Sequence, residues 1–445
     1  MNEKSALPRA IAVKPPGRPP EGALSVPGAK SLANRALLLA GAASGESRLS
    51  GLPGSDDVRA AVAALESLGV AVRRRGGEAI ISGRGIDFPV RKGDVPVGSS
   101  GTVGRFLPGL LAAAPAGNWR LIASPQLSAR PIRPLLDALR QWGAGLEAEE
   151  ADRAFPLQVA GGGLSGGDLA VSAAASSQFA SGVLLAAPFC RRPARIVIRD
   201  LDPDEVYIDM TLDLMRRFGA GAEAEAEGGE TVVRIDAPRP YRPADFAVEA
   251  DANTAAYFLS LAAVAGGCVT VTNLNPRSRQ PGVRFLDVLA RLGCGVETVG
   301  GGVAARGGPL PLRGGFALDM RAMAEMAVTL GILAVFADAP IRMANLAHIR
   351  GHESDRLAAL AALLGLAGVR TEESPDGITV HPAGREALRP FRIDPRNDHR
   401  LAMSFALLGA AGAGVVIDNP GCVAKTCPGF FDLLAGLGVS VELLP

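Results

Sequence analysis

The fold is decided by residues 55–70, which read SDDVRAAVAALESLGV. Apolar side chains recur three and four positions apart from Val58 to Leu68, which predicts a helix with one buried face. Gly69 follows where a helix commonly ends in the left-handed conformation, and a β-branched residue then begins a strand. The stretch therefore predicts an amphipathic helix joined to a strand by a glycine.

The same plan of helix, glycine and strand occurs six times along the chain. The other copies lie at residues 130–144, 207–220, 282–294, 353–369 and 428–439. The six glycines lie 70 to 76 residues apart and are Gly69, Gly143, Gly219, Gly293, Gly368 and Gly438. An internal repeat of this length predicts a fold built from copies of one α/β unit.

A second set of six helices is predicted between the amphipathic ones, and its members are apolar on nearly every side. They lie at residues 31–43, 100–114, 176–188, 253–267, 324–337 and 398–412. A helix without a polar face is buried inside a domain. Each repeat is thus predicted to contain one buried helix, one amphipathic helix and several strands.

Six repeats exceed what one hydrophobic core normally holds, so we expect two domains of three repeats each. The segment at residues 238–254, PRPYRPADFAVEADANT, is rich in proline and polar residues and predicts a hinge near residues 244–251. Buried small-residue helices enclosed by sheets suggest closed globules with three repeats each. The predicted fold class is α/β.

The composition of the 445-residue chain limits the kind of protein it encodes. With 48% hydrophobic and 20% charged residues, the chain is too apolar for intrinsic disorder. Lys plus Arg number 46 and Asp plus Glu 45, so no net charge favours nucleic acid or an anionic membrane. We expect neither a signal peptide nor a membrane span, because no apolar run reaches about 18 residues. Five cysteines without a Cys-x-x-Cys pair favour a reduced, cytoplasmic protein.

Polar and cationic residues gather where the buried helices begin. Helix N-termini present free N–H groups and the positive end of a dipole, so several facing one cleft would bind a ligand with several negative charges. Ser, Thr, Asn and Asp are also ordinary helix caps, and that alternative stays open. The residues concerned are Lys30, Ser31, Arg35, Ser99, Ser100, Gly101, Thr102, Arg105, Ser176, Ser177, Gln178, Glu325, Asn397, Asp398, His399 and Arg400.

Nine motifs of the chain resemble, in order and spacing, those of the enolpyruvyl transferases, specifically the 5-enolpyruvylshikimate-3-phosphate synthases. They are PGAKSLANRALLLA, SDDVRAAVAALESLGV, GSSGTVGRFL, ARPIRPLLDALRQWGA, SSQF, YIDMTLDLMRRFG, HESDRLAAL, NDHRLAMSFALL and PGCVAKTCP. The resemblance implies two inside-out α/β domains of three βαβαββ repeats each, which close on the substrates. We accordingly expect an N-terminal domain at residues 24–245 and a C-terminal domain at residues 1–23 plus 246–445.

The resemblance also implies a reaction, in which the enolpyruvyl group of phosphoenolpyruvate (PEP) moves to a hydroxyl of shikimate-3-phosphate and phosphate leaves. This chemistry needs cations for the two anionic groups of PEP, a proton donor for its methylene carbon and a base for the hydroxyl. By motif position, the residues that bind PEP would be Lys30, Arg130, Arg356, Arg400 and Lys425, with Gly101 and Gln178. The residues that transfer protons would be Lys30, Glu325 and Glu353. The remaining substrate-binding residues would be Ser31, Arg35, Thr102, Ser176, Ser177, Tyr207 and His399.

Several positions depart from the family pattern where the acceptor would bind. Glu325 stands where the family has the shorter Asp, so a base there works only if the backbone or the acceptor shifts by about an ångström. Asp204 replaces a Ser that contacts the acceptor phosphate, and a carboxylate there would repel that phosphate. His348 and His352 replace an Asn and a Lys, whereas Ser99 replaces an Asn and keeps a capping group. Asp204 and His352 are still counted among the substrate-binding residues.

Other functions stay open on the sequence. The chain would be a divergent enolpyruvyl transferase if its acceptor were a nucleotide, a sugar or a non-phosphorylated cyclitol. It would be a catalytically retired relative if it bound PEP without releasing phosphate. Pro125 stands where the UDP-N-acetylglucosamine branch has a cysteine, and the balanced charge disfavours an RNA 3′-terminal phosphate cyclase.

Several partners are not expected. His348 and His352 lack a third ligand, so the sequence predicts no metal. We also expect no cofactor and neither nucleic acid nor a membrane as partner. The prediction is a cytoplasmic monomer that acts on small molecules.

Overall fold

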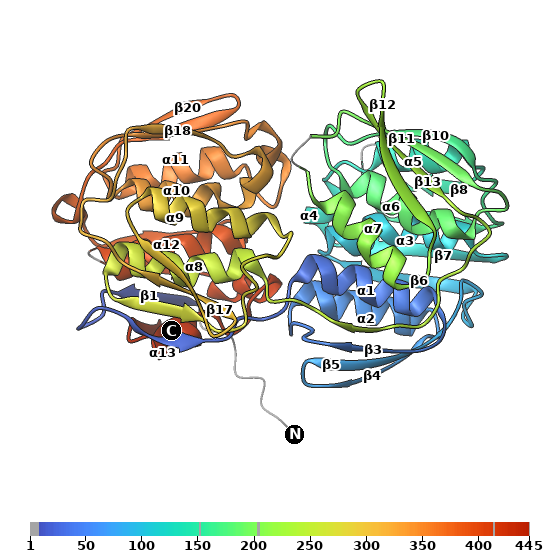
Figure 1. Cartoon of the computed structure of the whole chain (residues 1–445), viewed down its shortest axis with the longest axis horizontal. Coiled ribbons are helices and arrows are strands. Elements are labelled where there is room, and N and C mark those ends of the chain that lie inside the picture. Colours follow the sequence, from blue (N-terminus) through green and yellow to red (C-terminus); the bar gives the residue numbers. More distant parts are fainter. Residues whose placement is uncertain (1–8, 151–152, 203–204, 413, 445) are drawn as a thin grey trace. The chain divides into compact units, whose positions relative to one another are not determined.

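The computed structural model describes residues 9–150, 153–202, 205–412 and 414–444 (Figure 1). The chain forms two compact units, each with its own hydrophobic core. The N-terminal unit comprises Gly28–Val248, and the C-terminal unit comprises Met1–Pro27 and Glu249–Pro445. One predicted site residue, Asp204, lies outside the described residues.

The N-terminal unit contains three four-stranded sheets of one topology. In each sheet the first two strands are parallel, and the other neighbouring strands are antiparallel. The first sheet has the order β14 (Asp245–Ala247), β3 (Ser44–Ser50), β5 (Glu78–Arg84) and β4 (Ala71–Arg75). The second has the order β6 (Lys92–Gly98), β7 (Gly117–Ala123), β9 (Leu157–Gly161) and β8 (Gly145–Ala148). The third has the order β10 (Gly167–Ser172), β11 (Ala194–Arg199), β13 (Glu230–Ile235) and β12 (Ala222–Glu227).

The C-terminal unit repeats this topology in three further sheets. The first has the order β2 (Glu21–Leu24), β15 (Cys268–Val271), β17 (Gly302–Arg306) and β16 (Gly295–Val299). The second has the order β18 (Phe316–Asp319), β19 (Ile341–Ala344), β21 (Gly377–Val380) and β20 (Thr371–Ser374). The third has the order β22 (Phe391–Ile393), β23 (Val415–Asp418), β1 (Ala10–Lys14) and β24 (Ser440–Leu444).

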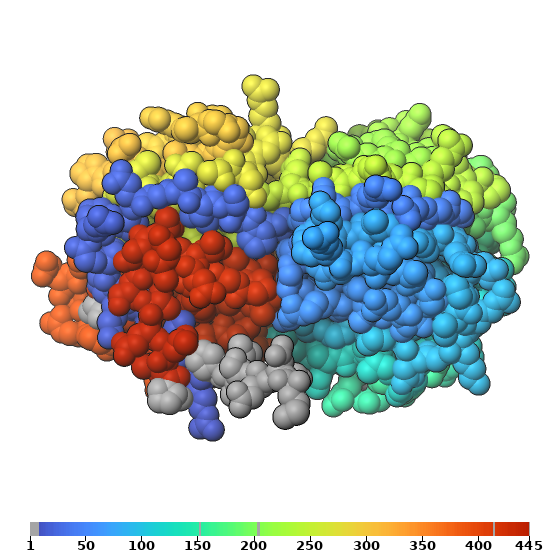
Figure 2. All heavy atoms as spheres, turned by 90° about the horizontal axis from the view of Figure 1, so that it is seen from below, coloured from blue at the N-terminus to red at the C-terminus, as the bar shows by residue number. Residues whose placement is uncertain are grey.

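Strand β1, the first among the described residues, lies between two strands from the C-terminal end of the sequence. Ala10 of β1 is paired with Asp418 of β23 on one side and with Leu444 of β24 on the other. In Figure 2 the blue N-terminal segment accordingly lies beside red C-terminal residues. The C-terminal unit is therefore assembled from both ends of the sequence.

Six helices are buried along nearly their whole length, as the sequence predicted. They are α1 (Lys30–Ala42), α3 (Gly101–Ala113), α6 (Gln178–Ala186), α8 (Ala252–Ala265), α10 (Ala327–Ala334) and α12 (His399–Ala411). In Figure 1, α1, α3 and α6 lie inside the N-terminal unit with its strands around them. Small residues permit this packing, since a Cβ at Gly182 of α6 would lie 2.3 Å from the carbonyl oxygen of Arg105 in α3.

The six amphipathic helices are α2 (Asp56–Ser67), α5 (Arg133–Gln141), α7 (Tyr207–Arg217), α9 (Phe285–Arg291), α11 (Arg356–Leu366) and α13 (Phe430–Gly436). All six glycines predicted to end them have positive φ, between 79° and 101°, which confirms that prediction. The remaining short helices are α4 (Pro125–Ser128), η1 (Ala187–Phe189), η2 (Pro281–Arg284), η3 (Arg321–Met326), η4 (Ala347–Gly351), η5 (Arg385–Ala387) and η6 (Pro420–Lys425). Among the described residues, we find no helix with the length and apolar character that crossing a membrane requires.

Candidate active site

In the N-terminal unit, Lys30 is held at the first position of α1 by a buried carboxylate. Its Nζ lies 3.1 Å from Oδ2 of Asp57, which belongs to the first turn of α2 and is 2% exposed. A carboxylate so deeply buried needs a cationic partner. The pair therefore fixes the ammonium group of Lys30 at the start of a buried helix, where the sequence predicted an anion-binding cation.

The beginning of α3 is tied to α1 by an amide that the sequence did not single out. Asn34 donates from Nδ2 to Oγ1 of Thr102 at 2.5 Å and to Oγ of Ser100 at 3.4 Å. Ser100 also caps α3 by accepting a hydrogen bond from the Val103 N–H. The Thr102 hydroxyl, which was predicted to bind substrate, is thus engaged in the contact between the two helices.

Gly101, Arg130 and Gln178, three residues predicted to bind PEP, lie close together. A Cβ at Gly101 would lie 3.3 Å from Nη1 of Arg130 and 3.7 Å from Oε1 of Gln178. The glycine thus leaves the first turn of α3 open toward a guanidinium group and an amide. Because free N–H groups of a helix N-terminus also lie there, this arrangement suits an anion.

Arg105, which was predicted to lie at the start of a buried helix, forms hydrogen bonds with residues of this group and with its neighbours. It donates from Nη1 to Oε1 of Gln178 at 2.9 Å and from Nη2 to the carbonyl oxygen of Pro131 at 3.0 Å. Its guanidinium carbon lies 5.0 Å from the centre of the Phe179 ring. A further contact of Nη1 reaches Oγ of Ser176 at 3.4 Å. Arg105 therefore orients Gln178 and Ser176, two predicted substrate-binding residues.

Arg35 is a buried cation that donates hydrogen bonds to neutral groups among the described residues. It donates to Oγ1 of Thr211 at 2.8 Å, to the carbonyl oxygen of Ser31 at 3.0 Å and to Oγ of Ser181 at 3.2 Å. Burial lowers the pKa of Arg35 to about 10, so its guanidinium stays protonated at neutral pH. Its guanidinium carbon also lies 5.9 Å from the ring centre of Tyr207. The positive charge is thus kept beside Ser31 and Tyr207, which were predicted to face the acceptor.

Glu205 adds a carboxyl group on this side of the N-terminal unit. Its Oε1 accepts a hydrogen bond from the Tyr207 N–H at 2.6 Å, at the start of α7. Burial raises the pKa of Glu205, while Ser177 and the charge of Arg35 act in the opposite direction. Ser177, which was predicted to bind the acceptor substrate, therefore lies beside a carboxyl group that is more easily protonated than an exposed one.

In the C-terminal unit, Arg356 is surrounded by three carboxylates. Its side chain, at the first position of α11, is 1% exposed. Nε lies 2.9 Å from Oδ2 of Asp398, Nη2 lies 2.7 Å from Oε2 of Glu353, and Nη1 lies 3.1 Å from Oε2 of Glu325. Although burial acts against the charged form, these carboxylates raise the pKa of Arg356 well above its usual value. The guanidinium is thus a permanent charge fixed from three sides.

Glu325, in η3, lies between two cations. Besides Arg356, its Oε2 pairs with Nε of Arg400, and its Oε1 lies 3.8 Å from Nδ1 of His352. Burial acts to raise the pKa of Glu325, but the charges of Arg400 and Arg356 hold it well below its usual value. In this arrangement Glu325 is an ionised carboxylate and a weak proton acceptor.

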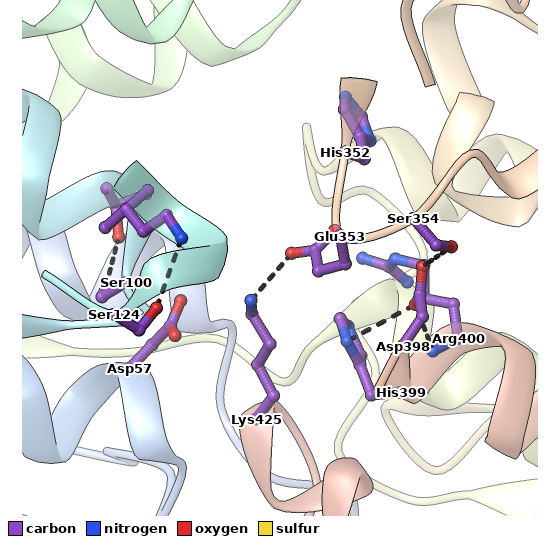
Figure 3. A network of polar contacts seen from close by, with 12 residues as sticks. Asp57, Ser100, Ser124, His352, Glu353, Ser354, Asp398, His399, Arg400 and Lys425 are labelled. Carbon is purple, nitrogen blue, oxygen red and sulfur yellow. Dashed lines mark hydrogen bonds and ion pairs between the residues drawn. The ribbon is translucent and has the colours of Figure 1, made fainter. Parts of the chain in front are cut away.

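Asp398 and His399 begin α12, and Asp398 joins this helix to the loop before α11. Asp398 has no exposed surface, accepts from the Arg400 N–H at 3.0 Å and accepts from the Ser354 hydroxyl at 2.9 Å (Figure 3). Nδ1 of the buried His399 lies 3.8 Å from Oδ1 of Asp398. The carboxylate that caps α12 therefore also orients Arg356.

Lys425 and Glu353 form a second buried pair in the C-terminal unit. Nζ of Lys425, at the end of η6, lies 2.9 Å from Oε1 of Glu353, and each side chain is 9% exposed (Figure 3). Since Oε2 of Glu353 is bound by Arg356, this carboxylate bridges two cations. The unit thus brings Glu325, Glu353, Arg356, Arg400 and Lys425 into one connected charge network.

The rings of His348 and His352 pack edge to face near this network, with centroids 5.8 Å apart. His352 Nδ1 lies 3.1 Å from Nη1 of Arg356. Across the described part of the chain, no three His, Cys, Asp or Glu side chains are grouped so that they could hold a metal ion.

The two units have the fold of solved enolpyruvyl transferases. A solved EPSP synthase from Acinetobacter baumannii superposes with a TM-score of 0.79 at 24% identity, covering 97% of this chain and 99% of that chain. The enolpyruvyl transferase NikO from Streptomyces tendae gives a TM-score of 0.75 at 18% identity, covering 98% of this chain and 99% of that chain. These two likenesses establish the fold.

The family follows from the sequence comparisons. The family model described as EPSP synthase (3-phosphoshikimate 1-carboxyvinyltransferase) matches residues 15–434. A protein of Halalkalibacterium halodurans named 3-phosphoshikimate 1-carboxyvinyltransferase 2 is 40% identical, over 95% of this chain and 93% of its own length. The 3-phosphoshikimate 1-carboxyvinyltransferase of Aeromonas salmonicida is 38% identical, over 94% of this chain and 97% of its own length. The chain belongs to the EPSP synthase family, as its motifs predicted.

Proposed function

We propose that this chain transfers the enolpyruvyl group of PEP to a hydroxyl of shikimate-3-phosphate and releases phosphate. The observation that carries the proposal is the charge network of the C-terminal unit, in a chain that matches the EPSP synthase family over residues 15–434. Arg356, Arg400 and Lys425 are cations held at fixed positions by carboxylates. A substrate that carries both a carboxylate and a phosphate can take over these contacts.

In the proposed reaction, the residues that bind PEP are Lys30, Arg130, Arg356, Arg400 and Lys425, with Gly101 and Gln178. The planar guanidinium groups can contact a carboxylate or a phosphate through two parallel hydrogen bonds, whereas the two lysines act as point charges.

Formation of the ketal needs two proton transfers, and its breakdown needs a third. The hydroxyl oxygen bonds to C2 of PEP and loses its proton to a base, while the methylene carbon gains a proton, which gives the tetrahedral ketal. The ketal then loses phosphate and a methyl proton, and the carbon–carbon double bond forms again. Glu353 and Lys30 are the proposed proton carriers from their motif positions, and each must be released from its partner of opposite charge before it transfers a proton. Glu325 must leave its two arginine partners before it can accept a proton.

The proposal defines the contacts of the acceptor substrate less closely than those of PEP. Ser31, Arg35, Ser176, Ser177 and Tyr207 would bind it, and the buried charge of Arg35 offers an electrostatic reason to select an acidic one. Thr102, Asp204, His352 and His399 complete the proposed set of substrate-binding residues.

The direct test is PEP-dependent phosphate release with a panel of alcohols, in which shikimate-3-phosphate is the reference. Release that is fastest with shikimate-3-phosphate supports the proposal. Release that requires a nucleotide, a sugar or a non-phosphorylated cyclitol instead makes the chain a divergent transferase. Binding of PEP without phosphate release from any alcohol makes it a retired relative.

We further propose that the enzyme works as a cytoplasmic monomer without a metal or another cofactor. Activity should survive exhaustive treatment with a chelator. Sedimentation at the assay concentration should give the mass of one 45.6 kDa chain, and a dimer mass would contradict this part of the proposal.

A further inference from the structure

Tyr257 is a buried residue of α8 to which the proposed reaction assigns no part. Its side chain has no exposed surface, and its ring packs edge to face on Phe430, with centroids 6.0 Å apart. A tyrosine ring has only two side-chain torsions, and tight packing on all sides fixes both. The position of its hydroxyl group is therefore set by the core.

That hydroxyl meets one of the proposed PEP cations. Tyr257 accepts a hydrogen bond from Nη1 of Arg400 over 3.2 Å, in the contact between α8 and α12. Nε of the same guanidinium pairs with Glu325. Arg400 is thus held by a core hydroxyl at one nitrogen and by a partly exposed carboxylate at another.

Glu325 and Tyr257 respond differently when an anion binds to Arg400. Glu325 carries the same kind of charge as the carboxylate of PEP, so the two compete for Arg400. The Tyr257 oxygen is neutral, and burial raises the pKa of this phenol, which keeps it neutral over the working pH range. Tyr257 therefore holds the guanidinium without cancelling the charge that an anionic ligand requires.

We propose that Tyr257 is a positioning residue that keeps Arg400 in place for PEP when Glu325 gives way. This inference rests on the proposed function, since it concerns the affinity for PEP. An arginine side chain loses substantial rotamer entropy when it is fixed, so a permanent partner in the core makes binding of PEP less costly.

The variant Tyr257→Phe tests this role, because it removes the hydroxyl and keeps the ring on Phe430. Loss of a hydrogen bond to a charged group should raise the KM for PEP by about tenfold. The kcat at saturating PEP and the KM for the acceptor should change less than about threefold, since Arg400 can still reach the ligand once PEP is in excess.

Tyr241→Phe is the matched control. Tyr241 is also fully buried, and its hydroxyl donates to the carbonyl oxygen of Leu185 at 2.9 Å in the N-terminal unit. This variant should lose some thermal stability, as Tyr257→Phe does, but should keep the wild-type KM for PEP. A rise in the KM for PEP in both variants would mean that loss of packing or stability causes the effect, and would overturn the inference.

A double-mutant cycle with Arg400→Lys supplies a second readout. If Tyr257 acts through the guanidinium, Tyr257→Phe should change the KM for PEP less than about twofold in the Arg400→Lys background. The same tenfold change in both backgrounds would overturn the inference, and so would an unchanged KM in the single variant. A wild-type chain that releases no phosphate with PEP and any acceptor overturns the proposed function instead, and with it the inference. The two failures are thus distinguishable.

Discussion

The substitution Asp398→Asn tests whether the cations of the C-terminal unit depend on one buried carboxylate. Asp398 has no exposed surface and lies 2.9 Å from Nε of Arg356, whose side chain is 1% exposed. The amide keeps an oxygen that can cap α12 but removes the charge that faces Arg356. Leaving a buried charge without its partner costs about 3–5 kcal/mol. Because Glu325 and Glu353 still pair with Arg356, we expect the lower end, about 3 kcal/mol.

Asp355→Asn is the matched control for this variant. Asp355 caps α11 by accepting from the Ala358 N–H at 3.1 Å, as Asp398 caps α12, but its partner Arg350 is 25% exposed and Asp355 itself 38%. Exposed ion pairs contribute about 0–1 kcal/mol. The control therefore removes the same charge from the same kind of helix position, with a small expected loss of stability.

Urea unfolding followed by far-UV circular dichroism is the appropriate assay. Both tryptophans of the chain, Trp119 and Trp142, lie in the N-terminal unit, so tryptophan fluorescence does not report on the unit that carries the substitution. Equal losses of unfolding free energy for the two variants, or a loss below about 1 kcal/mol for Asp398→Asn, would refute the reasoning. That reasoning holds that the buried Arg356 needs the Asp398 carboxylate for stability.

Three further substitutions follow from the geometry. Gly101→Ala places a methyl group 3.3 Å from Nη1 of Arg130 and should raise the KM for PEP several-fold, whereas Gly54→Ala, with nothing within 4 Å, should leave it unchanged. Lys425→Ala removes a proposed PEP cation and should lower kcat/KM for PEP at least a hundredfold, a loss of about 2.7 kcal/mol or more; a loss below tenfold would exclude that role. The depressed pKa of Glu325 stabilises the folded chain above its unfolded value of about 4.3, so Glu325→Gln should be less stable than wild type at pH 7. That difference in urea midpoint should shrink as the pH falls below about 4, and a difference independent of pH would contradict the ion pairs.

Much of the fold could be predicted because it depends on residue types that are visible within short stretches of the sequence. A glycine with positive φ ends every amphipathic helix, and the sequence marks these glycines by their spacing. Buried helices were predicted from the absence of a polar face. At Gly182 the structure supplies the reason for the small residues, since any side chain there would collide with the backbone of α3.

The limits of the two units were less predictable, and they differ from the expected ones by a few residues. The expectation divided the chain after residues 23 and 245, whereas the units divide it after Pro27 and Val248. The difference arises from strand pairing. Leu24 ends β2, which pairs with β15 of the C-terminal unit, and β14 (Asp245–Ala247) pairs with β3 of the N-terminal unit. Proline and polar content marks a linker but does not say which sheet its strands join.

The candidate site, too, could be predicted only in part from the sequence. The sequence named Glu325, Glu353 and Asp398, which pair with the cations of the C-terminal unit, but it did not single out three other supporting residues. Asn34, Asp57 and Tyr257 act on residues of other helices, and the partner of Tyr257 lies 143 positions along the chain. Hydrophobic periodicity says that a helix is buried and not which helix lies next to it. Such supporting contacts therefore emerge only once the tertiary structure is known.

The insertion of β1 between β23 and β24 has a consequence for synthesis of the chain. On the ribosome, all the strands of the N-terminal unit exist once residue 247 has been made, so that unit can complete its sheets while translation continues. The strands β1 and β2 precede the N-terminal unit in the sequence but belong to the C-terminal unit, and β1 cannot form its pairs with β23 and β24 until residues 415–444 have been made. Translation order and folding order are thus reversed for β1, which is synthesised before the N-terminal unit and pairs only after that unit is complete.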